Sequence, residues 1–75
     1  MEWQPLESEM FASAAYDAQS QTLYLRFRSG DVYRYFGFPE AQYPDFLNAD
    51  SRGRYFLKYI RDSFRHERLA KLRTA

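Results

Sequence analysis

One stretch of alternating residues places the strongest constraint on how this chain can fold. Residues 22–28 read Thr-Leu-Tyr-Leu-Arg-Phe-Arg, so every second side chain is apolar. This period of two predicts a half-buried strand, because successive side chains of a strand point to opposite faces. The apolar face carries Leu23, Leu25 and Phe27, and the opposite face carries Thr22, Tyr24, Arg26 and Arg28.

A second strand is predicted at residues 32–36, after a turn that contains Gly30. A two-residue loop would bury Arg34 in the apolar face of this hairpin, at a large desolvation cost. A three-residue loop, with Gly30 in the left-handed position of a bulge, turns Arg34 outward instead. We predict the second register because it buries no unpaired charge, and it places Tyr33 and Tyr35 on the apolar face.

The other periodic segments predict a small α+β domain. Residues 11–17 are an expected first strand, and residues 40–48 and 52–64 are expected helices. Pro44 predicts a kink or a fresh start in the first of these helices. Strands followed by helices predict a three-stranded antiparallel β-meander with one or two helices packed on one face, in the order β-β-β-α-α.

The length of 75 residues allows one domain. We expect a flexible tail at residues 1–9, the α+β domain at residues 10–64 and a basic extension at residues 65–75. The apolar positions lose their helical phase after Phe64, so we expect the second helix to fray or break there.

The chain offers little catalytic chemistry. It contains no cysteine, which excludes disulfides and a cysteine nucleophile and indicates a reducing, cytoplasmic location. The N-terminal residues lack a signal-peptide pattern, and no apolar run could span a membrane. His66 is the only histidine and lies among charged residues, so we expect a solvated side chain. We therefore expect no catalytic residue, cofactor, metal or small-molecule substrate.

The charge distribution gives the strongest functional signal. Residues 1–48 contain three arginines and seven acids (−4), whereas residues 49–75 contain eight Lys or Arg and three acids (+5). On one continuous helix, five of these cations would form an acid-free stripe: Arg54, Lys58, Arg61, Arg65 and Arg68. The stripe is either the solvated face of an amphipathic helix or a polyanion-binding face. The part of the stripe formed by Arg65 and Arg68 requires the helix to continue past Phe64.

A second candidate surface lies on the outer face of the predicted sheet. There, rings alternate with guanidinium groups in the set Tyr24, Arg26, Arg34 and Phe36. Such a surface suits stacking on unpaired bases with phosphate contacts beside them. The alternatives are an ordinary two-faced sheet and a face that another subunit covers.

Two groups of residues resemble the KTSC domain family. The first consists of Tyr16-Asp17, Leu23, Leu25, Phe27, Gly30 and Tyr33-Arg34-Tyr35, and the second of residues 48–56 followed by Ile60-Arg61. The resemblance covers roughly residues 8–61. This family is a short module found at the C-terminus of some lysyl-tRNA synthetases and alone in bacterial and phage proteins.

The resemblance implies structural roles for four motif residues: Tyr33, Tyr35, Ser51 and Gly53. It implies RNA binding through the synthetase context, but not aminoacylation, because this chain carries no synthetase domain. We therefore predict a non-enzymatic binding module with RNA as its partner. The alternative is a protein-interaction module or a homodimer that uses the aromatic sheet face.

Overall fold

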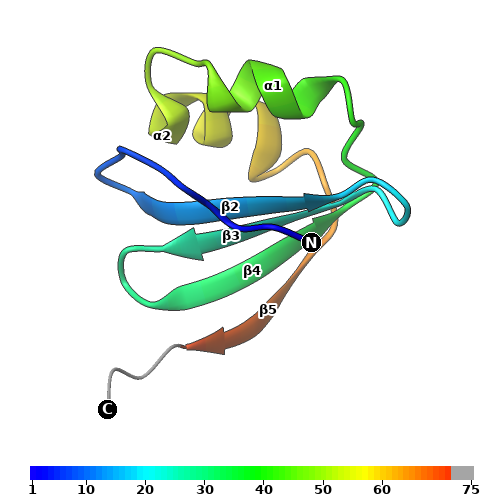
Figure 1. The fold of residues 1–75 in the computed structure, drawn as a ribbon, viewed down its shortest axis with the longest axis horizontal. Coiled ribbons are helices and arrows are strands. Elements are labelled where there is room, and N and C mark those ends of the chain that lie inside the picture. The colour runs from blue at the N-terminus through cyan, green and yellow to red at the C-terminus, as the bar shows by residue number, and fades with distance from the viewer. Residues whose placement is uncertain (72–75) are drawn as a thin grey trace.

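The computed structural model describes residues 1–71, which form one antiparallel sheet with helical segments on one side (Figure 1). The five strands lie in the order β1-β2-β3-β4-β5. The elements are β1 (Gln4–Pro5), β2 (Phe11–Asp17), β3 (Thr22–Phe27), β4 (Asp31–Phe36), α1 (Gln42–Leu47), α2 (Arg52–Tyr55), the π-helical segment η1 (Phe56–Ile60) and β5 (His66–Lys71).

The α+β class and the central meander β2-β3-β4 are confirmed, but the prediction of three strands is wrong. Strand β1 pairs with β2 at one edge of the sheet, and β5 pairs with β4 at the other. Neither edge strand has a strand-like alternation in its sequence. Their conformation comes from pairing with a strand already in place, which satisfies their backbone hydrogen-bonding groups.

The segment predicted as a tail, residues 1–9, is docked on the domain. Leu6 is 6% exposed, and its N–H donates to the carbonyl of Ala12. The guanidinium of Arg28 donates to the carbonyls of Leu6 and Ser8 at 3.0 and 2.6 Å. Of the predicted basic extension, residues 72–75 lie outside the described residues.

The β3–β4 hairpin has the predicted register. Its cross-strand partners include Leu23 with Tyr35, Tyr24 with Arg34 and Leu25 with Tyr33. Residues 28–30 form the loop, in which Gly30 has a φ of 98° and donates to the carbonyl of Phe27 at 2.9 Å. This left-handed conformation favours glycine, so a three-residue loop is available at little steric cost.

An aromatic cluster fills the space between the sheet and the helical segments. Phe11 is fully buried. Its ring centroid lies 4.9, 5.7 and 5.3 Å from those of Phe27, Phe46 and Phe56. Tyr35 is 3% exposed and meets Phe56 edge-on at 5.6 Å, as predicted. Tyr33 packs against the same cluster but is only half-buried.

The helix predicted over residues 52–64 ends at Ile60. The N–H of Arg61 donates to the carbonyl of Phe56, five residues earlier, which is the bond of a wider π-helical turn. The angular step of an α-helix would place Tyr59 on the same side as Phe56 and Ile60. Tyr59 is instead 44% exposed, whereas Phe56 and Ile60 are buried, because the wider turn rotates Tyr59 away from the core.

The helix starts follow ordinary capping chemistry. α1 begins at Gln42, so Pro44 lies in its first turn, where a missing N–H breaks no helical bond. The predicted kink or restart at Pro44 is therefore not needed. Ser51 caps α2, and its Oγ accepts the N–H of Arg54 at 3.2 Å.

Tyr35→Ala is expected to lower the free energy of unfolding by about 3–5 kcal/mol, because it removes a buried ring from the core. Tyr59→Ala truncates an exposed ring and should cost about 0.5 kcal/mol or less. Urea denaturation followed by circular dichroism measures both. Equal losses in the two variants would contradict the burial of Tyr35.

The stability of the domain should also depend on Tyr35 at high pH. Burial raises the pKa of the Tyr35 hydroxyl above its ordinary value of 10.0. A raised folded-state pKa contributes stability that is complete below the unfolded pKa and is lost as the pH rises through the folded pKa. We expect the free energy of unfolding to fall above about pH 10, and to fall less in Tyr35→Phe. Urea denaturation at either side of this pH tests the expectation, which an identical fall in both proteins would refute.

Candidate nucleic-acid interface

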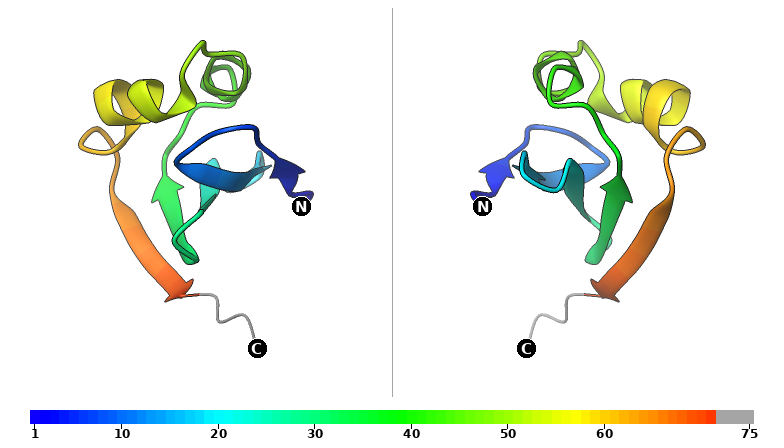
Figure 2. Two further views of the ribbon diagram at one scale, coloured as in Figure 1. Left: turned by 90° about the vertical axis from the view of Figure 1, so that its left-hand side faces the viewer. Right: turned by 90° about the vertical axis from the view of Figure 1, so that its right-hand side faces the viewer.

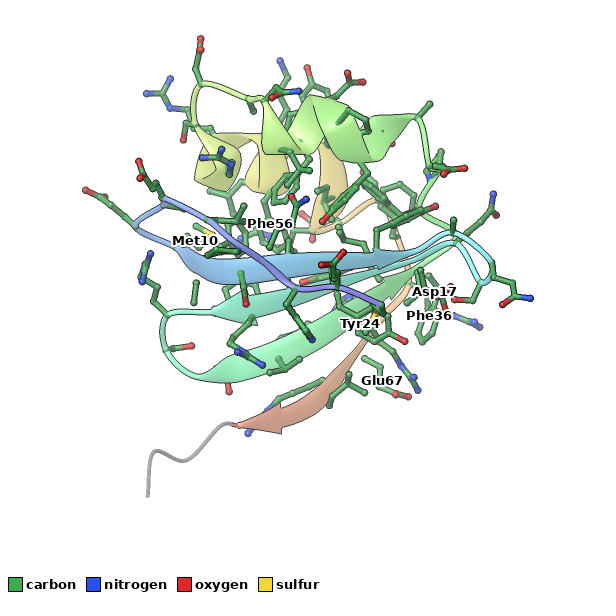
Figure 3. The ribbon with its side chains drawn as sticks, in the orientation of Figure 1. Met10, Asp17, Tyr24, Phe36, Phe56 and Glu67 are labelled. Atoms are coloured by element: carbon green, nitrogen blue, oxygen red, sulfur yellow. The ribbon has the colours of Figure 1, made fainter. Side chains whose placement is uncertain are left out.

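One face of the sheet is turned away from the helical segments. Two opposite side views show the helices gathered on the other face and β5 turning away from them toward its end (Figure 2). Tyr24, Phe36 and Glu67 project from the open face, while Met10 and Phe56 lie between the sheet and the helices (Figure 3). Within residues 1–71, no helix covers this open face.

Trp3 occupies one side of the open face, although the sequence gave no reason to place it there. Its ring centroid lies 6.3 Å from that of Tyr24, edge-on. The guanidinium carbon of Arg26 lies 4.8 Å from the centroid of the same ring. The pairing of β1 with β2 is what brings Trp3 beside β3. A lone tryptophan in a segment without periodicity was the only sequence signal for this contact.

The other side of the open face carries two arginines around Phe36. The guanidinium carbons of Arg34 and Arg65 lie 5.2 and 5.3 Å from its ring centroid. Arg34 also donates to the carboxylate of Glu67 on β5, which raises the pKa of Arg34 and keeps it charged. Arg65 reaches this face because its carbonyl accepts the N–H of Phe36 at 2.9 Å at the start of the β4–β5 pairing.

The guanidinium groups of Arg26 and Arg34 are held in place by their surroundings. Both side chains are partly buried, and in each the Nε atom is shielded from solvent with no hydrogen-bond partner among the described residues. A guanidinium has five N–H donors, so further donors of each group can serve a ligand. The open face thus combines three rings with three cations and one anion.

The predicted basic stripe is not continuous. Arg54 and Lys58 are exposed on the helical segment, and Arg61 is exposed beside Asp62, 3.5 Å away. Arg65 lies on the open sheet face instead, and Arg68 lies on β5, 3.5 Å from Asp31. The stripe breaks because the chain leaves the helix after Ile60 and becomes an edge strand.

Two residues of the predicted stripe, Arg54 and Lys58, border a groove of about 300 Å³. Tyr55 and Tyr59 form its aromatic wall, with ring centroids 4.7 Å apart. The Nζ of Lys58 lies 5.1 Å from the centroid of Tyr59, and Arg54 lines the same groove. This basic and aromatic groove is a second surface that could accept a polyanion.

The four motif residues have structural surroundings. Tyr33 and Tyr35 lie on the helix side of the sheet, and Ser51 is the N-cap of α2. Gly53 lies against Met10, so that a Cβ there would stand 3.4 Å from the terminal methyl of Met10. Among residues 1–71, no group of three His, Asp or Glu side chains is arranged to hold a metal ion. No helix in that range has the length and apolar character needed to cross a membrane.

The arrangement defines a small α+β module with one open, arginine- and aromatic-rich sheet face. Comparison with known proteins shows that the chain belongs to the KTSC domain family, which matches residues 7–64. A KTSC domain protein from Yersinia pestis has a solved structure with a TM-score of 0.88 and 32% identity, covering 92% of this chain and 97% of that one.

Relatives occur in two settings. A protein from Tsukamurella paurometabola is 39% identical over 62 residues, which are 83% of this chain and 92% of that protein. The lysine-tRNA ligase of Nostoc punctiforme is 38% identical over 64 residues, which are 85% of this chain. This chain spans only 11% of the length of that ligase. The module therefore stands alone in some proteins and forms a small part of others.

Proposed function

We propose that this chain is a non-enzymatic, cytoplasmic module that binds single-stranded RNA on the open face of its sheet. The observation that carries the proposal is the set of rings and guanidinium groups on that face. Trp3, Tyr24 and Phe36 alternate there with Arg26, Arg34 and Arg65.

The chemistry of unpaired RNA fits this arrangement. Bases that are not paired expose flat faces, and aromatic side chains stack on them with about 1–3 kcal/mol per base. Guanidinium groups beside the rings can take the phosphates of the same strand. Relatives that carry this module as a minor part are lysine-tRNA ligases, enzymes that act on an RNA, which supports the choice of ligand.

The alternative occupant of the open face is a protein, including a second copy of this chain. The half-buried rings of Trp3 and Phe36 would suit an apolar contact as well. Salt separates the two occupants. Phosphate binding weakens steeply as the salt concentration rises, whereas an apolar interface does not.

Arg26→Gln should weaken binding of a short single-stranded RNA and reduce its salt dependence. Each phosphate contact contributes about −0.7 to the slope of log K against log salt. Because Arg34 is paired with Glu67, the other two arginines predict a slope of roughly −1.4 for the wild type and about −0.7 for the variant. Fluorescence anisotropy of labelled RNA gives the slopes. Quenching of Trp3, the only tryptophan, reports whether the RNA reaches this face.

Arg54→Gln and Lys58→Gln are the matched controls, because both cations lie on the helical groove instead. Wild-type affinity in both controls supports the sheet face. If the two controls lose RNA binding while Arg26→Gln keeps it, the interface is the helical groove, and the placement of RNA on the sheet face is refuted. A wild-type domain that binds no RNA at about 50 mM salt, where electrostatic attraction is strong, would refute RNA binding itself.

Glu67→Gln is expected to strengthen RNA binding. The substitution removes the carboxylate that pairs with Arg34, so one more cation becomes available to a phosphate. The slope of log K against log salt should steepen by up to about 0.7. Asp62→Gln, which removes the carboxylate beside Arg61 on the helical side, is the control and should leave the slope unchanged. Identical slopes in Glu67→Gln and wild type would show that Arg34 makes no phosphate contact.

A further inference from the structure

A cleft of about 310 Å³ opens on the helix side of the sheet, between the β4–β5 pair and the end of η1. Its lining residues include Phe27, Asp31, Tyr33, Tyr35, Arg61 and His66. Burial decreases outward along it, from Tyr35 at 3% exposure to the half-buried Tyr33 and the exposed His66. Phe56 also lines the cleft, and Figure 3 places it on the face of the sheet opposite to Tyr24.

Three rings form one wall of this cleft. Tyr33 and Tyr35 stack with centroids 6.4 Å apart and planes 25° apart. The imidazole of His66 lies 5.9 and 5.4 Å from these two rings, and Phe27 meets Tyr33 edge-on at 5.6 Å. A planar heteroaromatic ring can stack on such a wall, because any flat π-system offers the same contact.

Several polar groups of the cleft can donate hydrogen bonds. The hydroxyls of Tyr33 and Tyr35 line it, and each carries one donor hydrogen. The Tyr35 hydroxyl is protonated at neutral pH, and burial raises its pKa further, so it can donate. Arg61 adds a guanidinium whose side chain is 55% exposed.

The charges of the cleft are separated. The contact of Arg61 with Asp62 is 3.5 Å long and both side chains are exposed, so an ion pair there is weak and leaves the guanidinium open to another anion. The carboxylate of Asp31 is already engaged, since Ser29 donates to it at 3.1 Å and Arg68 lies 3.5 Å away. One end of the cleft therefore favours an anion.

We propose that this cleft binds a mononucleotide, with the base stacked on Tyr33 and His66 and the phosphate on Arg61. A pocket of about 310 Å³ stands at the lower end of the ~300–1,000 Å³ range of ligand sites, which suits one nucleotide and not a longer segment. The site lies on the other face of the sheet from the proposed RNA surface and does not depend on it. The nucleotide is either free or the phosphorylated end of an RNA strand, since both present the same chemistry.

AMP is the probe, and the ring protons of His66 are the readout, because this is the only histidine of the chain. NMR titration of the full chain should shift these protons and the backbone signals of residues 33–35 and 61–66. Adenosine, which lacks the phosphate, and ribose 5-phosphate, which lacks the base, should each bind at least about ten-fold more weakly. No shift at millimolar AMP, or shifts confined to other residues, would overturn the proposal.

Variants separate the two parts of the ligand. Arg61→Gln should weaken AMP about ten-fold and leave adenosine unchanged. Tyr33→Leu should weaken the binding of both ligands. If the leucine variant is unstable, Tyr33→Phe is the second variant, and it should retain stacking because it keeps the ring. Arg54→Gln is the matched control and should bind AMP like the wild type. Equal AMP affinity in Arg61→Gln and Arg54→Gln would overturn the role of Arg61.

The source of the nucleotide is settled by competition. Displacement of AMP by an RNA with a 5′-phosphate, but not by the same RNA without it, identifies an RNA end as the ligand. Failure of both to displace AMP identifies a free nucleotide. Arg26→Gln should leave AMP binding unchanged, so loss of the sheet-face interaction and loss of this site are distinguishable.

Discussion

The left-handed conformation of Gly30 sets the register of the β3–β4 hairpin, and both faces of the sheet depend on that register. In the observed register Tyr35 packs on Phe56 in the core, and Arg34 lies on the open face beside Phe36. A slip of one residue would reverse every side chain of β4. Arg34 would then be buried without a partner, and the core would lose the ring of Tyr35.

The end of the second helix has a comparable influence on the charges. The π-helical turn at residues 56–60 is followed by a crossing to β5, so four cations of the C-terminal third are divided among three places. Arg54 and Lys58 stay with the helical groove, Arg61 borders the cleft, and Arg65 joins the open face. Each of these places also contains tyrosine or phenylalanine rings. A chain of only 75 residues thus presents several surfaces on which a cation lies beside aromatic rings.

The cations of the open face pack against its rings. Arg26 lies over Trp3, and Arg34 and Arg65 lie over Phe36. In the proposed RNA complex, side chains that already pack on rings would need less additional ordering, which favours affinity. The neutralisation of Arg34 by Glu67 acts in the opposite sense. The balance of these two effects would set the affinity of the proposed RNA complex.

The sequence by itself determined the elements whose signals are local. The alternation at residues 22–28 and the glycine in the loop specified β3 and the hairpin register. The positions of Trp3, Arg65 and Arg68 were decided only by the tertiary structure. Their segments have no periodicity of their own, and β1 and β5 become strands by adding to the edges of a sheet that distant residues have formed. The exposure of Tyr59 was also decided only by the tertiary structure. A single wider helical turn, stabilised by the packing of Phe56 and Ile60, rotated its side chain into solvent.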